Sequence, residues 1–80
     1  MSESEALARL QRVFDAVFVD PPLVHARLTA KEVPEWDSVK HIELLMAIEK
    51  EFGLNFSVGE MMEVQQIAGL VAVLVSRAAP

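Results

Sequence analysis

The chain has 80 residues and no cysteine, so we expect a single domain (residues 1–80) without disulfides or thiolate metal sites. The hydrophobic fraction is 52% and the mean hydropathy is +0.32. These values imply closely packed apolar helix faces, or an interior that can also bind an apolar group. The first ten residues lack the regions of a signal peptide, and the longest apolar run, residues 67–75, is too short to span a bilayer. We therefore expect a soluble cytoplasmic protein.

The formal net charge of −5 at pH 7 is concentrated in the middle of the chain. Residues 35–63 hold seven acids against Lys40 and Lys50, whereas acids and bases balance elsewhere. This distribution argues against nucleic-acid binding, which depends on Lys and Arg contacting phosphates. It favours a protein partner with a basic face, and a solvated helix surface is the alternative.

The first predicted element is a helix from about residue 3 to residue 18. Ser2 and Glu5 have the spacing of a capping box at its start. Asp20-Pro21-Pro22 ends it, because proline supplies no donor and restricts the residue before it. Apolar residues recur between these signals at helical spacing, at Leu7, Leu10, Phe14 and Val17.

Residues 19–37 form a long connection, which is predicted to be packed rather than loose. Trp36 near its end is expected to anchor it to the core. The other expected anchors are apolar: Leu23, Val24, Leu28 and Val33.

A second helix is predicted from Asp37-Ser38 to about Phe52-Gly53, with Gly53 as its C-terminal stop. Glu43 and Lys50 are expected to face solvent. The expected buried stripe is apolar and is broadened by Leu44 and Ile48; its members are Val39, Ile42, Leu45, Met46 and Phe52.

Two further helices follow in the prediction. Ser57 and Glu60 form another capping box, which opens a short third helix through about Glu63, and a fourth helix covers roughly residues 67–77. No β alternation is present, so the predicted fold is all-α with four helices. The residues assigned to the core or its rim are Phe14, Phe18, Phe52, Phe56, Met46, Met61, Met62, Ile67, Leu70, Val71 and Leu74.

Residues for catalysis or metal binding are scarce. His25 and His41 do not have metal-ligand spacing with each other, and the three glycines form no phosphate-binding loop. Ser38 precedes His41 by one helical turn, but no third group completes a nucleophilic site. We expect neither an enzyme nor a metal protein.

Residues 36–53 read WDSVKHIELLMAIEKEFG. This stretch resembles the second helix of acyl carrier proteins, whose pattern is Asp-Ser-Leu, an apolar-Glu-Leu-apolar run, and later Glu and Phe. An isolated Asp-Ser-apolar triplet is usually an ordinary helix N-cap, but here the match continues over 18 residues and the flanking elements agree. The resemblance implies a four-helix bundle of acyl carrier protein type, with a short third helix and a long loop between helices 1 and 2.

The resemblance also implies a prosthetic group. In the family, 4′-phosphopantetheine is esterified to the serine that here is Ser38, and its thiol carries an acyl group as a thioester. Asp37 is similar to the acid that precedes this serine. A phosphodiester at Ser38 would lie at a helix N-terminus, where free N–H groups and the helix dipole favour an anion. A separate phosphopantetheinyl transferase attaches the group.

In the family the second helix docks on the enzymes that load, extend or unload the cargo. The resemblance therefore implies partner contacts at Val39, Lys40, Glu43, Glu49 and Met61. The implied partners are the transferase and an acyl-loading ligase, synthase or acyltransferase with a basic docking face. The carrier itself is expected to be a monomer.

Several positions depart from carriers of fatty acid synthesis. Lys40 and Lys50 stand where acids are common, Val58 and Met62 replace residues that are often acidic, and Gln66 replaces a usual Ser or Thr. These departures fit a specialised stand-alone carrier with a dedicated enzyme, in fatty acid, polyketide or lipid synthesis. An aminoacyl or peptidyl carrier is the alternative within the class, and an unmodified helical adaptor is the alternative outside it.

Overall fold

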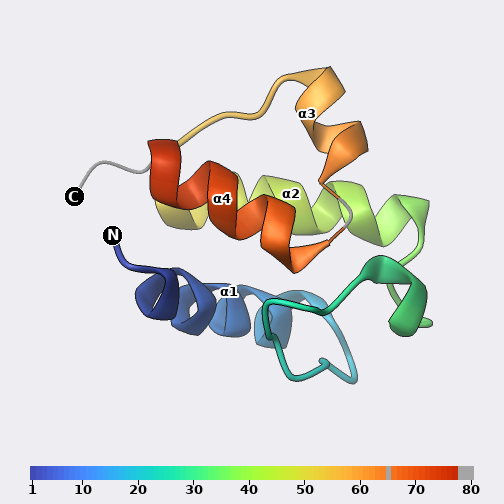
Figure 1. Ribbon diagram of the computed structural model, residues 1–80. Coiled ribbons are helices and arrows are strands. Elements are labelled where there is room, and N and C mark those ends of the chain that lie inside the picture. Colours follow the sequence, from blue (N-terminus) through green and yellow to red (C-terminus); the bar gives the residue numbers. More distant parts are fainter. Residues whose placement is uncertain (65, 78–80) are drawn as a thin grey trace.

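The computed structural model describes residues 1–64 and 66–77, apart from the side chains of Met62 and Glu63. The assignment of Met62 to the core or rim therefore lies outside the described residues. A one-turn 3-10 helix at Ala30–Glu32 lies in the long connection, and the four α-helices are α1 (Glu3–Val17), α2 (Ser38–Phe52), α3 (Val58–Glu63) and α4 (Ile67–Arg77) (Figure 1). The predicted all-α class with four helices is confirmed.

Local signals in the sequence set the helix ends. Ser2 accepts the Glu5 N–H at 3.1 Å at the start of α1. Gly53 ends α2 in the left-handed conformation, with φ at +67°, which a residue without Cβ adopts without steric cost. Ser57 and Glu60 form the predicted capping box of α3.

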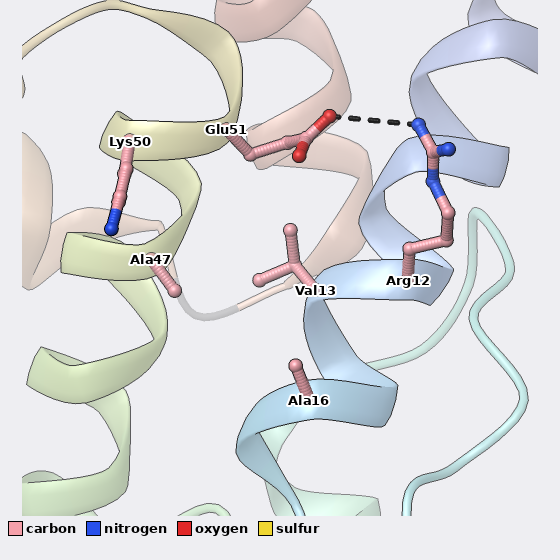
Figure 2. A pocket seen from close by; sticks show the side chains of 6 residues that line it. All are labelled: Arg12, Val13, Ala16, Ala47, Lys50 and Glu51. Carbon is pink, nitrogen blue, oxygen red and sulfur yellow. Dashed lines mark ion pairs between the residues drawn. The ribbon is translucent and has the colours of Figure 1, made fainter.

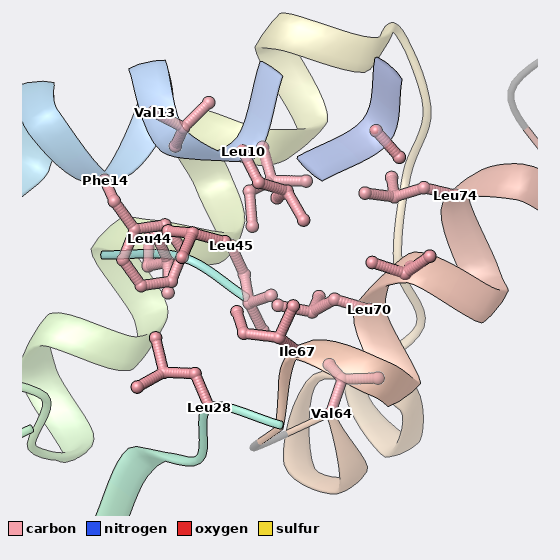
Figure 3. Close-up of a cluster of buried hydrophobic side chains, with 14 of the residues drawn as sticks. Leu10, Val13, Phe14, Leu28, Leu44, Leu45, Val64, Ile67, Leu70 and Leu74 are labelled. Atoms are coloured by element: carbon pink, nitrogen blue, oxygen red, sulfur yellow. The ribbon is translucent and has the colours of Figure 1, made fainter. Parts of the chain in front are cut away.

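The core lies among α1, α2 and α4. Helix α1 packs against both of the others, and Figure 3 shows side chains from all three helices converging on one cluster. The four phenylalanines assigned to the core are all buried, so that prediction is confirmed. The largest side chains with almost no exposure are Leu10, Phe14, Leu44, Leu45, Ile48, Ile67, Leu70 and Leu74.

The long connection is anchored as predicted at three of the four apolar positions. Val24, Leu28 and Val33 are buried, but Leu23 is 78% exposed, so the prediction for Leu23 was wrong. The side chain of Gln11 explains the difference, because its amide accepts the Val24 N–H at 2.8 Å and donates to a carbonyl of the same stretch. These bonds hold Val24 against α1, and successive side chains of an extended backbone point to opposite sides.

The predicted inward stripe of α2 was wrong for three residues. Val39, Ile42 and Met46 are 70%, 44% and 60% exposed. Both they and the residues that do face inward repeat at helical spacing, so the periodicity alone does not select the buried face. Only one side of α2 is covered, and the residues buried there are His41, Leu44, Leu45, Ile48 and Phe52. No helix among the described residues has the length and apolar character needed to cross a membrane.

This assignment of faces predicts opposite effects at two adjacent positions of α2. Leu45→Ala should lower the free energy of unfolding by about 2–5 kcal/mol, because it removes buried methyl groups and leaves a cavity. Met46→Ala, the matched control, should change it by less than about 0.5 kcal/mol, because Met46 lies at the surface. Urea denaturation followed by circular dichroism measures both. Similar losses in the two variants would show that α2 is rotated from the described orientation.

Candidate functional site

The first turn of α2 presents an exposed serine at a helix N-terminus. Asp37 is the N-cap, and its Oδ1 accepts the Lys40 N–H at 2.8 Å. Ser38 is the next residue, the first of the helix, and its side chain is exposed. The first N–H groups of any α-helix lack partners within the helix, and the helix dipole adds a partial positive charge there. This end of α2 therefore suits an anionic group on Ser38.

The Trp36 side chain fixes the backbone just before this serine. Trp36 is 5% exposed, and its indole N–H donates to Nδ1 of His41 at 2.9 Å. His41 Nε2 lies 2.6 Å from the Met61 carbonyl oxygen. Because an indole can only donate, Nδ1 must accept, so the proton lies on Nε2 and is donated to Met61. The bonds join the end of the long connection to α2 and α3.

Two aromatic side chains at the C-terminal end of α1 pack against the same indole. The Phe14 and Phe18 rings meet it edge-on, with ring centroids 5.4 Å and 6.3 Å away. Their own rings stack at 5.1 Å. Edge-to-face pairs at these distances are favourable beyond the area that they bury. The prediction that Trp36 anchors the loop to the core is confirmed.

Glu35, near the end of the long connection, binds the backbone at the start of that connection. Its carboxylate accepts the backbone N–H groups of Val19 at 2.8 Å and Asp20 at 3.1 Å. These two hydrogen bonds, with that of Val19 first, hold the pKa of the Glu35 carboxyl below its usual value. The segment that follows α1 is thereby tied to the residues that precede Ser38.

Lys40 is engaged within the protein rather than free in solvent. Its Nζ lies 3.3 Å from the Glu43 carboxylate and 4.0 Å from that of Glu35, and it donates to the Val17 carbonyl oxygen at 3.4 Å. Val17 is the last residue of α1, where a positive charge also complements the helix dipole. Lys40 therefore links α2 to the C-terminus of α1.

The other acids of residues 35–63 that the structure describes also have internal contacts. Glu49 is half-buried, and its carboxylate accepts the Phe56 N–H at 2.7 Å. Glu51 pairs with Arg9 at 3.0 Å, and Glu60 pairs with Arg77. The Ser57 backbone N–H, followed by the Ser57 hydroxyl and Arg77, holds the pKa of Glu60 below its usual value.

The structure brings some of the predicted site residues together and separates others. Asp37 is the N-cap of α2, and the first two turns of the helix hold Ser38, Val39, Lys40 and Glu43. Glu49 follows Ser38 by eleven residues, about 16 Å along the helix axis. Met61 lies on α3, is half-buried and packs against the core.

Sequence reasoning missed three features of this region: the Glu35 contacts, the Trp36–His41 bond, and the exposure of Ile42 and Met46. A signal for the last was present, because Val39, Ile42 and Met46 repeat at i, i+3 and i+7. The two polar contacts have no such signal, since they depend on how the connection folds back.

An open groove of about 480 Å³ lies between α1 and α2. In Figure 2 its lining residues come from facing sides of the two helices, and an ion pair joins Arg12 to Glu51 at 3.6 Å. The residues of α2 in this groove begin at Ala47, about 14 Å along the axis from Ser38. The groove is therefore separate from the exposed serine. Within residues 1–64 and 66–77 no cluster of histidine and acidic side chains is suited to a metal ion.

The comparisons with known proteins agree with this geometry. Residues 36–74 match the family model described as phosphopantetheine attachment site. The match covers 39 of the 80 residues, and it confirms the predicted resemblance at the level of a phosphopantetheine carrier. Members of the family hold 4′-phosphopantetheine covalently on a serine. The search of curated proteins found no significant match.

The geometry predicts that the bond between Trp36 and His41 stabilises the fold. Trp36→Phe should lower the free energy of unfolding by about 1–3 kcal/mol, because it leaves Nδ1 of buried His41 without a donor. Leu23→Ala, a control in the same connection, should have almost no effect, since Leu23 is exposed. Chemical denaturation measures both variants. Equal stability of Trp36→Phe and the wild type would contradict the role assigned to this bond.

Proposed function

We propose that residues 1–80 form a specialised carrier domain that holds an acyl group as a thioester on 4′-phosphopantetheine attached to Ser38. It presents the cargo to other enzymes and performs no catalysis itself. The observation that carries this proposal is the exposed Ser38 at the start of α2, inside the segment that matches the carrier family.

The matched segment contains two serines, Ser38 and Ser57, and they have different structural roles. Ser57 caps α3, since its hydroxyl accepts the Glu60 N–H at 3.2 Å. The N-cap of α2 is Asp37 and not Ser38. Esterification of Ser38 would leave the cap of α2 intact, whereas esterification of Ser57 would compete with the cap of α3. This difference supports Ser38 as the attachment residue.

The surroundings of Ser38 supply position and charge for the prosthetic group. The helix N-terminus favours the phosphodiester anion, and Trp36 and Glu35 hold the preceding backbone in place. The thiol of the arm supplies the thioester chemistry that the cysteine-free chain lacks. The protein only has to expose Ser38 to a transferase and keep α2 ordered.

The proposed docking surface comprises Val39, Lys40, Glu43, Glu49 and Met61. Glu43 is its exposed acid and lies one to two turns from Ser38, so it is the residue that would meet a basic side chain of a ligase, synthase or acyltransferase. Lys40 contributes by holding Glu43 in place. Glu49 lies further along α2 and Met61 lies on α3; both are half-buried and so offer less surface to a partner.

An acyl cargo is favoured over an aminoacyl one by the high apolar content and by the Asp37-Ser38-Val39 sequence. The substitutions Lys40, Lys50 and Val58 favour a dedicated pathway of fatty acid, polyketide or lipid type over general fatty acid synthesis. We expect the carrier to act in the cytoplasm as a monomer.

The proposal predicts one covalent arm on one residue. A broad-specificity phosphopantetheinyl transferase with coenzyme A should add a single arm to the wild type and none to Ser38→Ala. Ser57→Ala is the matched control and should still be modified, although loss of its cap should cost about 1 kcal/mol of stability. Intact-protein mass spectrometry measures all three. An arm on Ser38→Ala, or none on the wild type, would contradict the proposal.

The choice of an acyl cargo predicts a stability difference between loaded forms. A medium-length acyl chain should raise the melting temperature above that of the unloaded arm, because each buried CH₂ contributes roughly 0.8 kcal/mol. Met61, which borders the core on α3, should shift in NMR spectra of the acylated form. A polar aminoacyl cargo serves as the control and should change neither. Identical melting curves for the acyl and aminoacyl forms would argue against acyl burial.

A further inference from the structure

Among the described residues, His41 is the only polar or charged one that the fold buries, with 7% of its surface exposed. The proposed attachment of an arm to Ser38 makes no use of it. Both ring nitrogens are occupied: Nδ1 accepts the Trp36 indole N–H at 2.9 Å, and Nε2 donates to the Met61 carbonyl oxygen at 2.6 Å. We call these two hydrogen bonds the His41 link.

Only a neutral ring can make the His41 link. A neutral imidazole has one donor and one acceptor nitrogen, whereas an imidazolium has two donors and no acceptor. A second proton on His41 would lie on Nδ1 and face the Trp36 indole N–H, which is also a donor. That bond would be lost, the buried indole would have no acceptor, and a positive charge would lie in the interior. Protonation of His41 and the His41 link therefore exclude each other.

No described side chain gives the His41 ring a compensating negative charge. The end of α1 contributes aromatic rings beside the indole. The charged side chains on the other neighbouring segments are those of Glu35, Asp37, Lys40, Glu43 and Glu60. Glu35 and Asp37 bind backbone N–H groups, Lys40 pairs with Glu43, and Glu60 pairs with Arg77. In the described part of the chain, the ring itself bonds only to Trp36 and Met61.

Helix α3 depends on its contacts with other helices. It has six residues, and helices this short are marginal in water on their own. Among the described residues, two polar contacts join it to other helices: the ion pair of Glu60 with Arg77 of α4, and the bond of Met61 to His41 of α2. The ion pair is partly exposed, so its contribution is small. Without the His41 link, α3 keeps only this ion pair and the packing of Met61 against the core.

We propose that His41 is a proton-sensitive switch: the neutral ring holds α3 against α2, and a second proton on the ring releases α3. The proton comes from solvent and adds to Nδ1, which then loses the bond from Trp36. The ring lies between Trp36 and the backbone of α3, so its charge can be hydrated only when α3 moves away. The inference goes beyond the proposed function and does not depend on an arm on Ser38, although the switch lies one helical turn from that serine.

The pH range of the switch follows from ordinary side-chain chemistry. Between about pH 7.5 and about pH 5.5 histidines change charge, whereas carboxyl groups titrate near about pH 4. The backbone N–H groups of Val19 and Ser57 hold the pKa values of Glu35 and Glu60 below the usual value, so these carboxylates stay charged. Because the open form binds the extra proton, a fall in pH favours release of α3. An ordinary imidazole that is protonated only in the open form raises the opening constant by about tenfold over this range.

Hydrogen exchange measured by NMR on the full chain tests the switch. The probes are the indole N–H of Trp36, the only tryptophan in the chain, and the Met61 amide of α3, which donates to the Ser57 carbonyl oxygen. Their protection factors, corrected for the intrinsic exchange rate at each pH, are compared at about pH 7.5 and about pH 5.5. His41→Gln keeps a donor and an acceptor in a side chain that does not titrate. His25→Gln is the matched control, because His25 is the other histidine of the chain and is exposed.

Both probes should lose protection by about tenfold at the lower pH in the wild type and in His25→Gln, and by less than about twofold in His41→Gln. The Leu10 amide of α1 should stay far better protected at both pH values, because the opening is local. If His41→Gln does not fold, the wild type and His25→Gln still decide, since His41 is the one histidine left in the control.

Three results would overturn the proposal. One is unchanged protection of the two probes in the wild type. Another is a loss of protection that persists in His41→Gln or disappears in His25→Gln. The third is equal protection of the Leu10 and Met61 amides, because the opening would then be global unfolding and not the release of α3.

Discussion

The burial of one tryptophan determines how the start of α2 is presented. Trp36 lies two residues before Ser38, and its indole packs on Phe14 of α1 and on Phe18, the C-cap of that helix. The indole N–H donates to His41 of α2, three residues after Ser38. His41 then donates to the backbone of α3. The Trp36 side chain thus links three helices to the backbone beside Ser38, the proposed attachment residue, so Ser38 can be exposed and still be held in a defined position.

In the folded protein, several carboxylates of residues 35–63 are paired with basic side chains. Read along the chain, residues 35–63 are strongly acidic, but the fold sets Lys40, Arg9, Arg12 and Arg77 against their carboxylates. Glu35 meanwhile serves two backbone N–H groups. Most acids of this region therefore have contacts within the fold, while Val39, Ile42 and Met46 are exposed on α2.

The sequence predicted the parts of this fold that local chemistry controls. Helix ends followed from Asp37, Gly53 and Ser57, because caps act within one turn. The inward face of α2 was not predictable, since Ile42 and Leu45 are equally apolar and only the arrangement of neighbouring helices separates them. The contacts of Lys40 with Val17 and of Glu49 with Phe56 could not be predicted either. Each joins two segments that come together only when the loop between them folds back. In the candidate site, the pattern around Ser38 predicted the attachment residue, which stays a prediction, whereas the contacts that support Ser38 required the structure.

We propose that Ser38 carries 4′-phosphopantetheine in the living cell. The most direct measurement is tandem mass spectrometry of the protein isolated from the cells that make it, with the modified peptide sequenced. The account predicts one phosphopantetheine group, with or without an acyl cargo, on the peptide that contains Ser38. A fully unmodified protein, or an arm on any other residue, would contradict it.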